Sequence, residues 1–204
     1  MKFKLASFFT LAMLFAINAN AAAVKYMPGD YKIDPDHSRV SFVIKHFVVS
    51  EVEGRFNEVK GDFVLAPIFA DSTVEATIDM NSIDTAVKKR DDDLRSKNFF
   101  DVATYPSMTL KSKKFMGTPE SFTLIAFLTI KDVTKEVSFV GKYTGSVRDP
   151  WGNERVALQM KGKIMRKDFH IMYDEKVSIG PAVGEEVMIE VRTEGINKVD
   201  NSKM

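Results

Sequence analysis

Residues 72–101 read STVEATIDMNSIDTAVKKRDDDLRSKNFFD, and this stretch joins two different hydrophobic patterns. In its first part, apolar residues alternate with polar ones, and the apolar positions are Val74, Ala76, Ile78 and Met80. A period of two is typical of a strand that buries one face and exposes the other. The pattern therefore predicts a half-buried strand over residues 72–82.

The second part of the stretch, from residue 82 to 101, does not alternate. Its apolar residues are spaced more like one side of a short helix, with charged residues between them: Val87, Leu94, Phe99 and Phe100. Thr85 is a candidate N-cap, because a hydroxyl can accept a hydrogen bond from a free amide of the first helical turn. We expect one short helix that caps or flanks the end of a β-structure.

Most of the remaining chain alternates in the same way as the first part. On residues 38–47 the apolar face holds Val40, Phe42, Ile44 and His46, and residues 48–54 are interpreted as a bend. Further strands are expected within 31–34, 55–65, 108–117, 122–130, 137–147, 156–164 and 187–191. About eight strands with short connections predict an all-β fold, either an antiparallel barrel or a sandwich, and we interpret it as an eight-stranded barrel.

The two ends of the chain have a different composition from the strands. Residues 1–21 combine a basic start, an apolar run and a small-x-small motif at Ala19-Asn20-Ala21, as in a cleaved secretory signal peptide. We expect a linker over 22–30, the barrel domain over 31–197 and a tail over 198–204. The predicted location is the periplasm, with no membrane span after signal removal.

Composition excludes several classes of function. Removal of residues 1–21 takes away only the charges of Lys2 and Lys4, which changes the formal charge from +1 to −1. A nearly neutral domain argues against nucleic acid as a partner. The absence of cysteine excludes disulfides, thiolate metal sites and a cysteine nucleophile. The three histidines show no metal-binding spacing, so we predict no metal and no cofactor, even where His37 lies beside Asp34 and Asp36.

Several phrases of the sequence follow one another in a specific order. They are Tyr31-x-Ile33-Asp34-x-x-His37-Ser38, Phe42-x-x-x-His46, Gly54-x-Phe56, Ser82-Ile83-Asp84-Thr85, Arg90-Asp91-x-x-Leu94, Phe99-Phe100-Asp101, Tyr105-Pro106, Leu128-Thr129-Ile130-x-x-Val133-Thr134-Lys135, Asp149-Pro150-Trp151-Gly152 and Arg166-x-Asp168-Phe169. In order and spacing the chain resembles the YceI-like family of secreted bacterial proteins, from about Tyr31 to Glu194. It departs from that family at Asp132 and His170, where glycine is common.

The resemblance implies a lipocalin-like barrel that binds a polyisoprenoid, such as an isoprenoid quinone or a polyprenyl lipid, in an elongated apolar pore without catalysis. Alternation and the barrel interpretation predict the pore lining. These candidates are Phe42, Ile44, Phe56, Phe63, Ile78, Met80, Leu94, Phe99, Phe100, Met108, Leu110, Leu128, Phe139, Leu158, Met160, Ile164 and Phe169. The competing interpretation is that these residues only fill a solid core.

Three polar residues are added to the candidate ligand site. Arg90 and Asp91 are placed to orient a head group, or else form an ion pair that holds the helix on the barrel rim. His46 shares the apolar face of Phe42 and Ile44, and is either a ligand contact or a hydrogen-bonded core histidine.

Two other classes of function stay open at this point. One is an enzyme that uses His46 or Asp91 on a lipid or quinone, although the chain has neither a Gly-x-Ser-x-Gly motif nor a nucleotide-binding glycine loop. The other is a stress-related scaffold without lipid. Candidate partners are a second copy of the chain and, for a quinone carrier, a membrane-bound redox protein such as a cytochrome.

Overall fold

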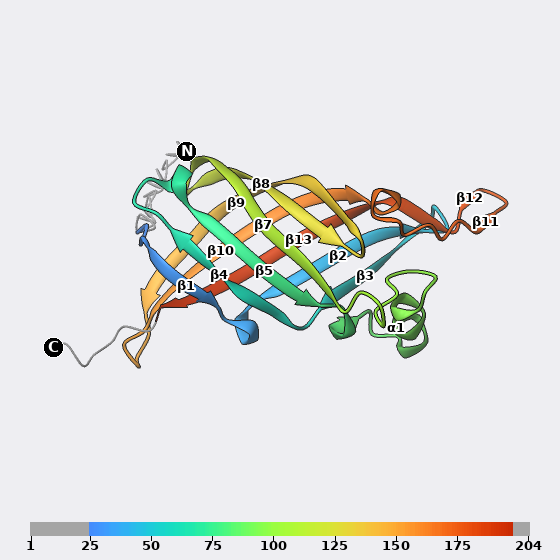
Figure 1. Cartoon of the computed structure of the whole chain (residues 1–204), viewed down its shortest axis with the longest axis horizontal. Helices are drawn as coiled ribbons and strands as arrows, with labels where there is room; N and C mark the ends of the chain where they lie inside the picture. The colour runs from blue at the N-terminus through green and yellow to red at the C-terminus, as the bar shows by residue number, and fades with distance from the viewer. Residues whose placement is uncertain (1–24, 198–204) are drawn as a thin grey trace, which may run out of the picture.

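The computed structural model describes residues 25–197, which form one elongated β-structure with the helix α1 at one end (Figure 1). The predicted signal peptide, the first part of the predicted linker and the predicted tail lie outside the described residues.

The described strands are β1 (Gly29–Ile33), β2 (Arg39–His46), β3 (Ser50–Phe56), β4 (Val59–Leu65), β5 (Thr73–Asp79), β6 (Ile83–Asp84), β7 (Ser107–Thr118), β8 (Ser121–Ile130), β9 (Val133–Arg148), β10 (Glu154–Met165), β11 (Lys176–Val177), β12 (Gly180–Pro181) and β13 (Val183–Asn197). The α-helix is α1 (Lys88–Arg95), and 3-10 turns span Pro35–His37, Phe69–Asp71, Met80–Ser82 and Arg166–Phe169.

Some of these strands are segments of longer, bent strands. The turn at Pro35–His37 separates β1 from β2, residues 57–58 separate β3 from β4, and the turn at Met80–Ser82 separates β5 from β6. Each of these three pairs of segments counts as one long strand. Together with β7, β8, β9, β10 and β13, they form an eight-stranded antiparallel barrel. The predicted fold class is therefore confirmed.

Strand β13 closes the barrel because it pairs with both segments of the first long strand. At its end Ile196 lies opposite Lys32 of β1, and at its start Val187 lies opposite Ile44 of β2. Along its other side it pairs with β10 from Glu186 to Asn197. Closure satisfies the backbone hydrogen bonds that an open sheet edge would expose.

Aromatic side chains plug the end of the barrel away from α1. Phe69, from the turn after β4, contacts the rings of Tyr26, Phe115 and Phe122 at centroid distances of 5.2 to 5.8 Å. Tyr26 also meets Tyr143 edge to face at 5.5 Å. These rings fill the barrel interior at that end, whereas the interior near α1 is not completely filled by side chains.

The structure corrects three local predictions. Residues 48–54 are not a bend, because β3 begins at Ser50 and pairs with β2. The helix covers only Lys88–Arg95, and its N-cap is Val87 without a side-chain cap, so Thr85 is not the cap. The described part of the predicted linker, residues 25–30, belongs to the fold, since β1 begins at Gly29 and Tyr26 donates a hydrogen bond to the carbonyl of Ala66.

Gly61 allows two strands to approach closely. Its φ is +148°, and a Cβ added there would lie 2.1 Å from the carbonyl oxygen of Glu75 on β5. We expect Gly61→Ala to lower the free energy of unfolding by about 2 kcal/mol, because the wall must shift. Gly145→Ala is the control, since a Cβ there meets nothing within 4 Å. Equal losses in denaturant titrations of the two variants would contradict this account.

Candidate ligand-binding cavity

The barrel contains a cavity of about 300 Å³ whose lining is almost entirely apolar. Alternation along the strands aims one set of side chains inward, and the aromatic plug fills only the opposite end. Both the size and the apolar lining are typical of small-molecule sites. The cavity lies beside α1, because Arg90, Asp93 and Leu94 of that helix line it.

Most of the predicted site residues line this cavity. They are Phe42, Ile44, His46, Phe56, Phe63, Ile78, Arg90, Leu94, Phe99, Phe100, Met108, Leu110, Leu128, Phe139, Met160 and Ile164. The predicted residues outside the lining are Met80, Asp91, Leu158 and Phe169, all of them buried. Leu158 lies opposite Tyr143 at the plugged end, and Met80 and Phe169 belong to 3-10 turns next to the wall.

Other lining residues were not among the predicted site residues. They are mainly aliphatic: Ile33, Val40, Val52, Val59, Val74, Ala76, Ile130, Ile171, Val183, Val187, Ile189 and Val191. The alternation of β5 and β13 already placed Val74, Ala76, Val187, Ile189 and Val191 on the inner face. The predicted pore lining favoured larger side chains such as Phe and Met, and it therefore omitted these smaller residues. Val52 was missed because its strand was interpreted as a bend.

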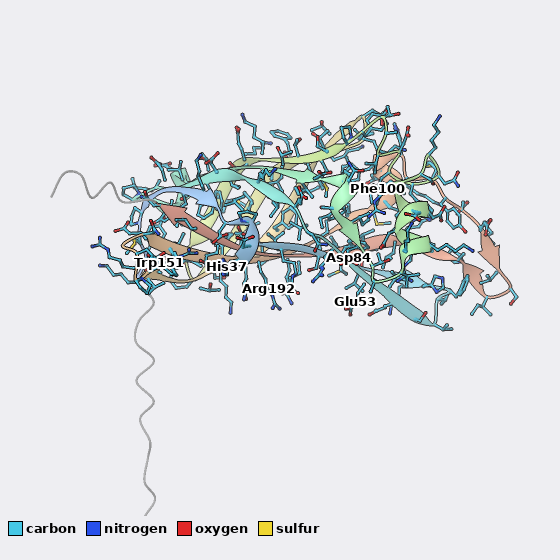
Figure 2. All side chains as sticks on the ribbon, turned by 90° about the horizontal axis from the view of Figure 1, so that it is seen from below. His37, Glu53, Asp84, Phe100, Trp151 and Arg192 are labelled. Carbon is cyan, nitrogen blue, oxygen red and sulfur yellow. The ribbon has the colours of Figure 1, made fainter. Side chains whose placement is uncertain are left out.

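Aromatic rings cover the cavity at the α1 end. Phe99 is buried and stacks on Tyr173 with a centroid distance of 4.8 Å. Phe100 meets Phe56 edge to face at 6.3 Å, and Figure 2 shows Phe100 near α1, whereas His37 and Trp151 lie toward the opposite end. Phe99 and Phe100 belong to the segment after α1, and Tyr173 belongs to the loop before β11. The residues that cover the cavity therefore lie on loops and not on barrel strands.

Arg90 and Asp91 hold Thr85 and do not pair with each other. Arg90 donates from Nε to Thr85 Oγ1 and from Nη2 to the Thr85 carbonyl, each at 2.8 Å. Asp91 accepts the Thr85 amide at 2.9 Å and the Thr85 hydroxyl at 2.6 Å. The hypothesis of an Arg90–Asp91 ion pair is therefore wrong. Both residues fix α1 on the segment that leads out of β6, and only Arg90 also faces the cavity.

Two further cationic or titratable groups line the same end. His46 is half-buried, and its ring lies 3.9 Å from the ring of Phe47, centroid to centroid. Arg166 is 3% exposed and donates to the carbonyls of Gly184, Ile171 and Val183. Burial lowers the pKa of Arg166, while the charges of Glu185 and Asp174 act in the opposite direction.

Asp132 and His170, the two residues predicted to depart from the family pattern, contact each other. His170 Nδ1 lies 3.2 Å from Asp132 Oδ1, and Lys131 Nζ donates to the His170 carbonyl at 3.0 Å. Neither Asp132 nor His170 is among the cavity-lining residues. Their contact joins the β8–β9 turn to the loop that carries Tyr173, at the rim of the site.

A carboxylate cluster lies away from the cavity, around the turn between β1 and β2. Asp34, His37 and Glu194 are close enough to suggest a cation site. The guanidinium of Arg155 occupies this position instead: it bonds to Asp34 Oδ2 at 2.8 Å, to Asp149 Oδ2 at 2.9 Å and to Glu194. The cluster is thus an ion-pair network that ties β1, β10 and β13 together.

The fold and cavity define a class of protein, an antiparallel lipocalin-like β-barrel with an apolar ligand site. The model of the YceI-like domain matches residues 31–195, and the chain belongs to this family. UPF0312 proteins of Yersinia enterocolitica and Yersinia pestis are each 36% identical over 188 residues, which cover 91% of this chain and 92% of those proteins.

Solved structures share the same barrel. BcnA of Burkholderia cenocepacia superposes with a TM-score of 0.70 at 25% identity, covering 79% of this chain and 98% of BcnA. A YceI protein of Campylobacter jejuni gives 0.66 at 25% identity, covering 76% and 90%. A polyisoprenoid-binding domain of Saccharophagus degradans gives 0.59 at 16% identity, covering 82% and 98%, and this likeness is one of fold.

Within residues 25–197, no helix is both long and apolar enough to cross a membrane.

The Asp91 contacts predict that the Asp91 carboxylate stabilises the attachment of α1 to the segment after β6. Asp91→Ala leaves the buried amide and hydroxyl of Thr85 without their acceptor, and we expect a loss of about 2 kcal/mol in the free energy of unfolding. Denaturant titration measures it. Asp92→Ala on the exposed face of α1 is the matched control and should cost less, and an equal loss would contradict this role.

The Arg155 network predicts a pH dependence of stability. Burial alone would raise the pKa of Asp149, but hydrogen bonds from Asn153 and Arg155 lower it from 3.8 to about 2. The pKa of Asp34 is also lowered, by Arg155 and His37 acting against burial. A carboxyl whose folded pKa is depressed stabilises the fold above its unfolded pKa, and this contribution is lost as the pH falls through its folded pKa.

Arg155→Met should therefore lower the melting temperature most above about pH 5, with a difference from the parent that shrinks toward about pH 2. Arg148→Met is the control, since the Arg148 side chain, which pairs with Glu154, is 57% exposed, against 18% for Arg155. Melting curves from pH 7 to pH 2 make the test. A difference that stays constant with pH would contradict it.

Proposed function

We propose that this protein binds one long isoprenoid lipid, an isoprenoid quinone or a polyprenyl compound, in its barrel cavity and carries, stores or sequesters it in the periplasm. The observation that carries the proposal is an apolar cavity in a closed barrel, covered at one end by Phe99 and Phe100. Support comes from the YceI-like family match and from the fold shared with a polyisoprenoid-binding domain. The periplasmic location rests on the leader pattern of residues 1–21.

The driving force for such binding is burial of the lipid tail. Removing apolar surface from water contributes roughly 25 cal/mol per Å². A tail has many such carbons, so the gain exceeds the cost of ordering it within walls that the barrel already holds in place. Branched aliphatic residues and phenylalanines of the lining offer contact to methyl-branched isoprene units along the cavity.

The polar end of the lipid would lie near α1. His46, Arg90 and Arg166 line the cavity there, and none of the three is paired with a carboxylate in the recorded ion pairs of the described residues. A few polar groups at the mouth of an apolar pocket are the usual source of orientation and specificity. Their donors suit carbonyl, hydroxyl or phosphate oxygens.

Binding without catalysis is the form of the proposal that the site supports. The cavity surface is almost wholly apolar. Of the two acid–base candidates, Asp91 is engaged by Thr85 outside the lining, and only His46 faces the cavity. An extracted lipid that returns chemically unchanged after incubation would agree with a carrier. A changed lipid would favour an enzyme.

Organic extraction of the purified protein, followed by mass spectrometry and an ultraviolet spectrum, tests the proposal. We expect a polyisoprenoid near one per chain, and a quinone absorbance would identify a redox lipid. Protein that extracts empty, and stays empty after incubation with isoprenoid lipids, would overturn the proposal in favour of a scaffold.

Neighbouring residues of β7 provide a matched pair of variants. Leu110 lines the cavity, whereas Thr109 is exposed on the outer face. Leu110→Lys places an ammonium in an apolar site, and we expect at least a tenfold loss of bound lipid. Thr109→Lys should load like the parent, and melting curves of both show that the barrel stays folded. Equal loading of the two variants would remove the cavity as the binding site.

A further inference from the structure

Two loops beyond the cavity present apolar side chains to solvent. The turn between β2 and β3 exposes Phe47 (40%), Val48 (51%) and Val49 (77%), and the β11–β12 hairpin exposes Val177 (36%) and Ile179 (61%). Figure 1 shows the β11–β12 hairpin at the extreme end of the molecule, on the same end as α1. We call these five side chains the apolar tip.

The two loops form one surface. The Phe47 amide donates to the carbonyl of Ala182, just after β12, at 2.9 Å. A Cβ at Gly180 would lie 3.0 Å from Val48 Cγ2, so the side chain of Val48 already rests on the second hairpin. The apolar tip is therefore continuous, and its parts are positioned by backbone contacts.

The backbone conformation of the first loop is unfavourable for two of its residues. Phe47 and Val48 both have a positive φ, 49° and 66°. Two consecutive residues of this kind in a hairpin normally favour Asn-Gly, because a branched side chain such as valine is strained there. Strained backbone conformations of this kind are found most often at functional sites. Stability alone would favour different residues in this turn.

The apolar tip borders the opening of the cavity. His46, the residue before Phe47, lines the cavity and pairs with Val183, which also lines it. Lys45 and Asp93, two exposed residues of the lining, give the cavity an opening at this end, and the exposed pair Arg39 and Arg192 lines it farther along β2 and β13. A surface that held the tip would lie directly against this opening.

The charge of the two loops suits a lipid surface. Residues 46–50 and 176–181 contain no carboxylate, and their charged or titratable side chains are those of His46 and Lys176. The adjoining carboxylates are engaged, because Glu51 pairs with Lys45 at 2.7 Å and Glu175 accepts the Tyr173 hydroxyl at 2.9 Å. Apolar side chains flanked by a basic residue are typical of segments that lie in the interfacial region of a bilayer. A single copy of the tip is small, which fits reversible contact better than a lasting anchor.

We propose that the apolar tip inserts into the interfacial region of a lipid bilayer and sets the cavity opening against the membrane, where a lipid ligand is taken up or released. The transfer step rests on the proposed lipid-carrier function, and so does the choice of a bilayer over a protein partner, because the proposed cavity ligand dissolves in membranes.

Co-sedimentation of the purified chain with phosphatidylcholine vesicles measures insertion directly. We expect binding that changes less than about twofold when salt is raised, because apolar contact is not screened. The double variant Val48→Asp, Ile179→Asp should bind at least tenfold more weakly. Val140→Asp, Val147→Asp is the matched control, since these valines of β9 are equally exposed (62% and 59%) and lie outside the tip.

A second variant separates insertion from folding. Replacing Phe47-Val48 by Asn-Gly relieves the strained turn, so we expect an unchanged or higher melting temperature together with at least a tenfold loss of vesicle binding. Parent protein that ignores vesicles, or tip variants that bind like the control, would overturn the proposal. Sedimentation velocity without lipid is the remaining arm: a dimer that only the tip variants abolish would assign the tip to a second copy and also overturn it.

Loading from detergent-dispersed isoprenoid lipid keeps the two proposals distinguishable. Tip variants should load from detergent as the parent does, but should load from vesicles at least tenfold more slowly. Failure of every variant and the parent to load from either source would count against the lipid-carrier function and leave vesicle insertion to be judged by co-sedimentation alone.

Discussion

The pairing of β13 with both segments of the first long strand is the constraint on which the rest of the structure depends. It converts an open sheet into a closed wall whose backbone groups are paired across the seam. Because the wall holds its own shape, the interior does not have to be filled everywhere. The aromatic plug around Phe69 fills one end, and the cavity occupies the other.

The α1 end combines less regular elements with the functional features. The helix is fixed through Thr85 by Arg90 and Asp91, and the following residues place Phe99 over the cavity beside Tyr173. Loops positioned by a rigid scaffold are a common place for binding functions. Here the same end carries the covering aromatic rings, the cationic lining and the exposed apolar tip, so binding, orientation of a head group and contact with a membrane would occur together.

The Asp132–His170 contact and the Arg155 network both join residues that are distant in the sequence. Asp132 and His170 are 38 residues apart and meet at the rim. Asp34, which the sequence places beside His37 as a weak metal candidate, instead receives Arg155 from β10. In both cases the barrel fold brings together residues that are distant along the chain, and the partner determines which interaction each side chain makes.

Alternation in the sequence by itself determined the all-β class and most of the inward-facing residues, since the period of two fixes which side chains share a face once a strand forms. The choice of a barrel over a sandwich rested on the family resemblance. It did not determine where the cavity ends, because Leu158 and Met160 lie on the same face but only Met160 lines the cavity. Tertiary structure alone decided that Asp91 serves Thr85 and that residues 47–49 and 176–181 form one surface. The two loops meet because β2 pairs with β13, residues far apart in the sequence, whereas Asp91 and Thr85 are only six residues apart and meet because the chain turns from β6 into α1. Hydrophobic alternation encodes neither contact.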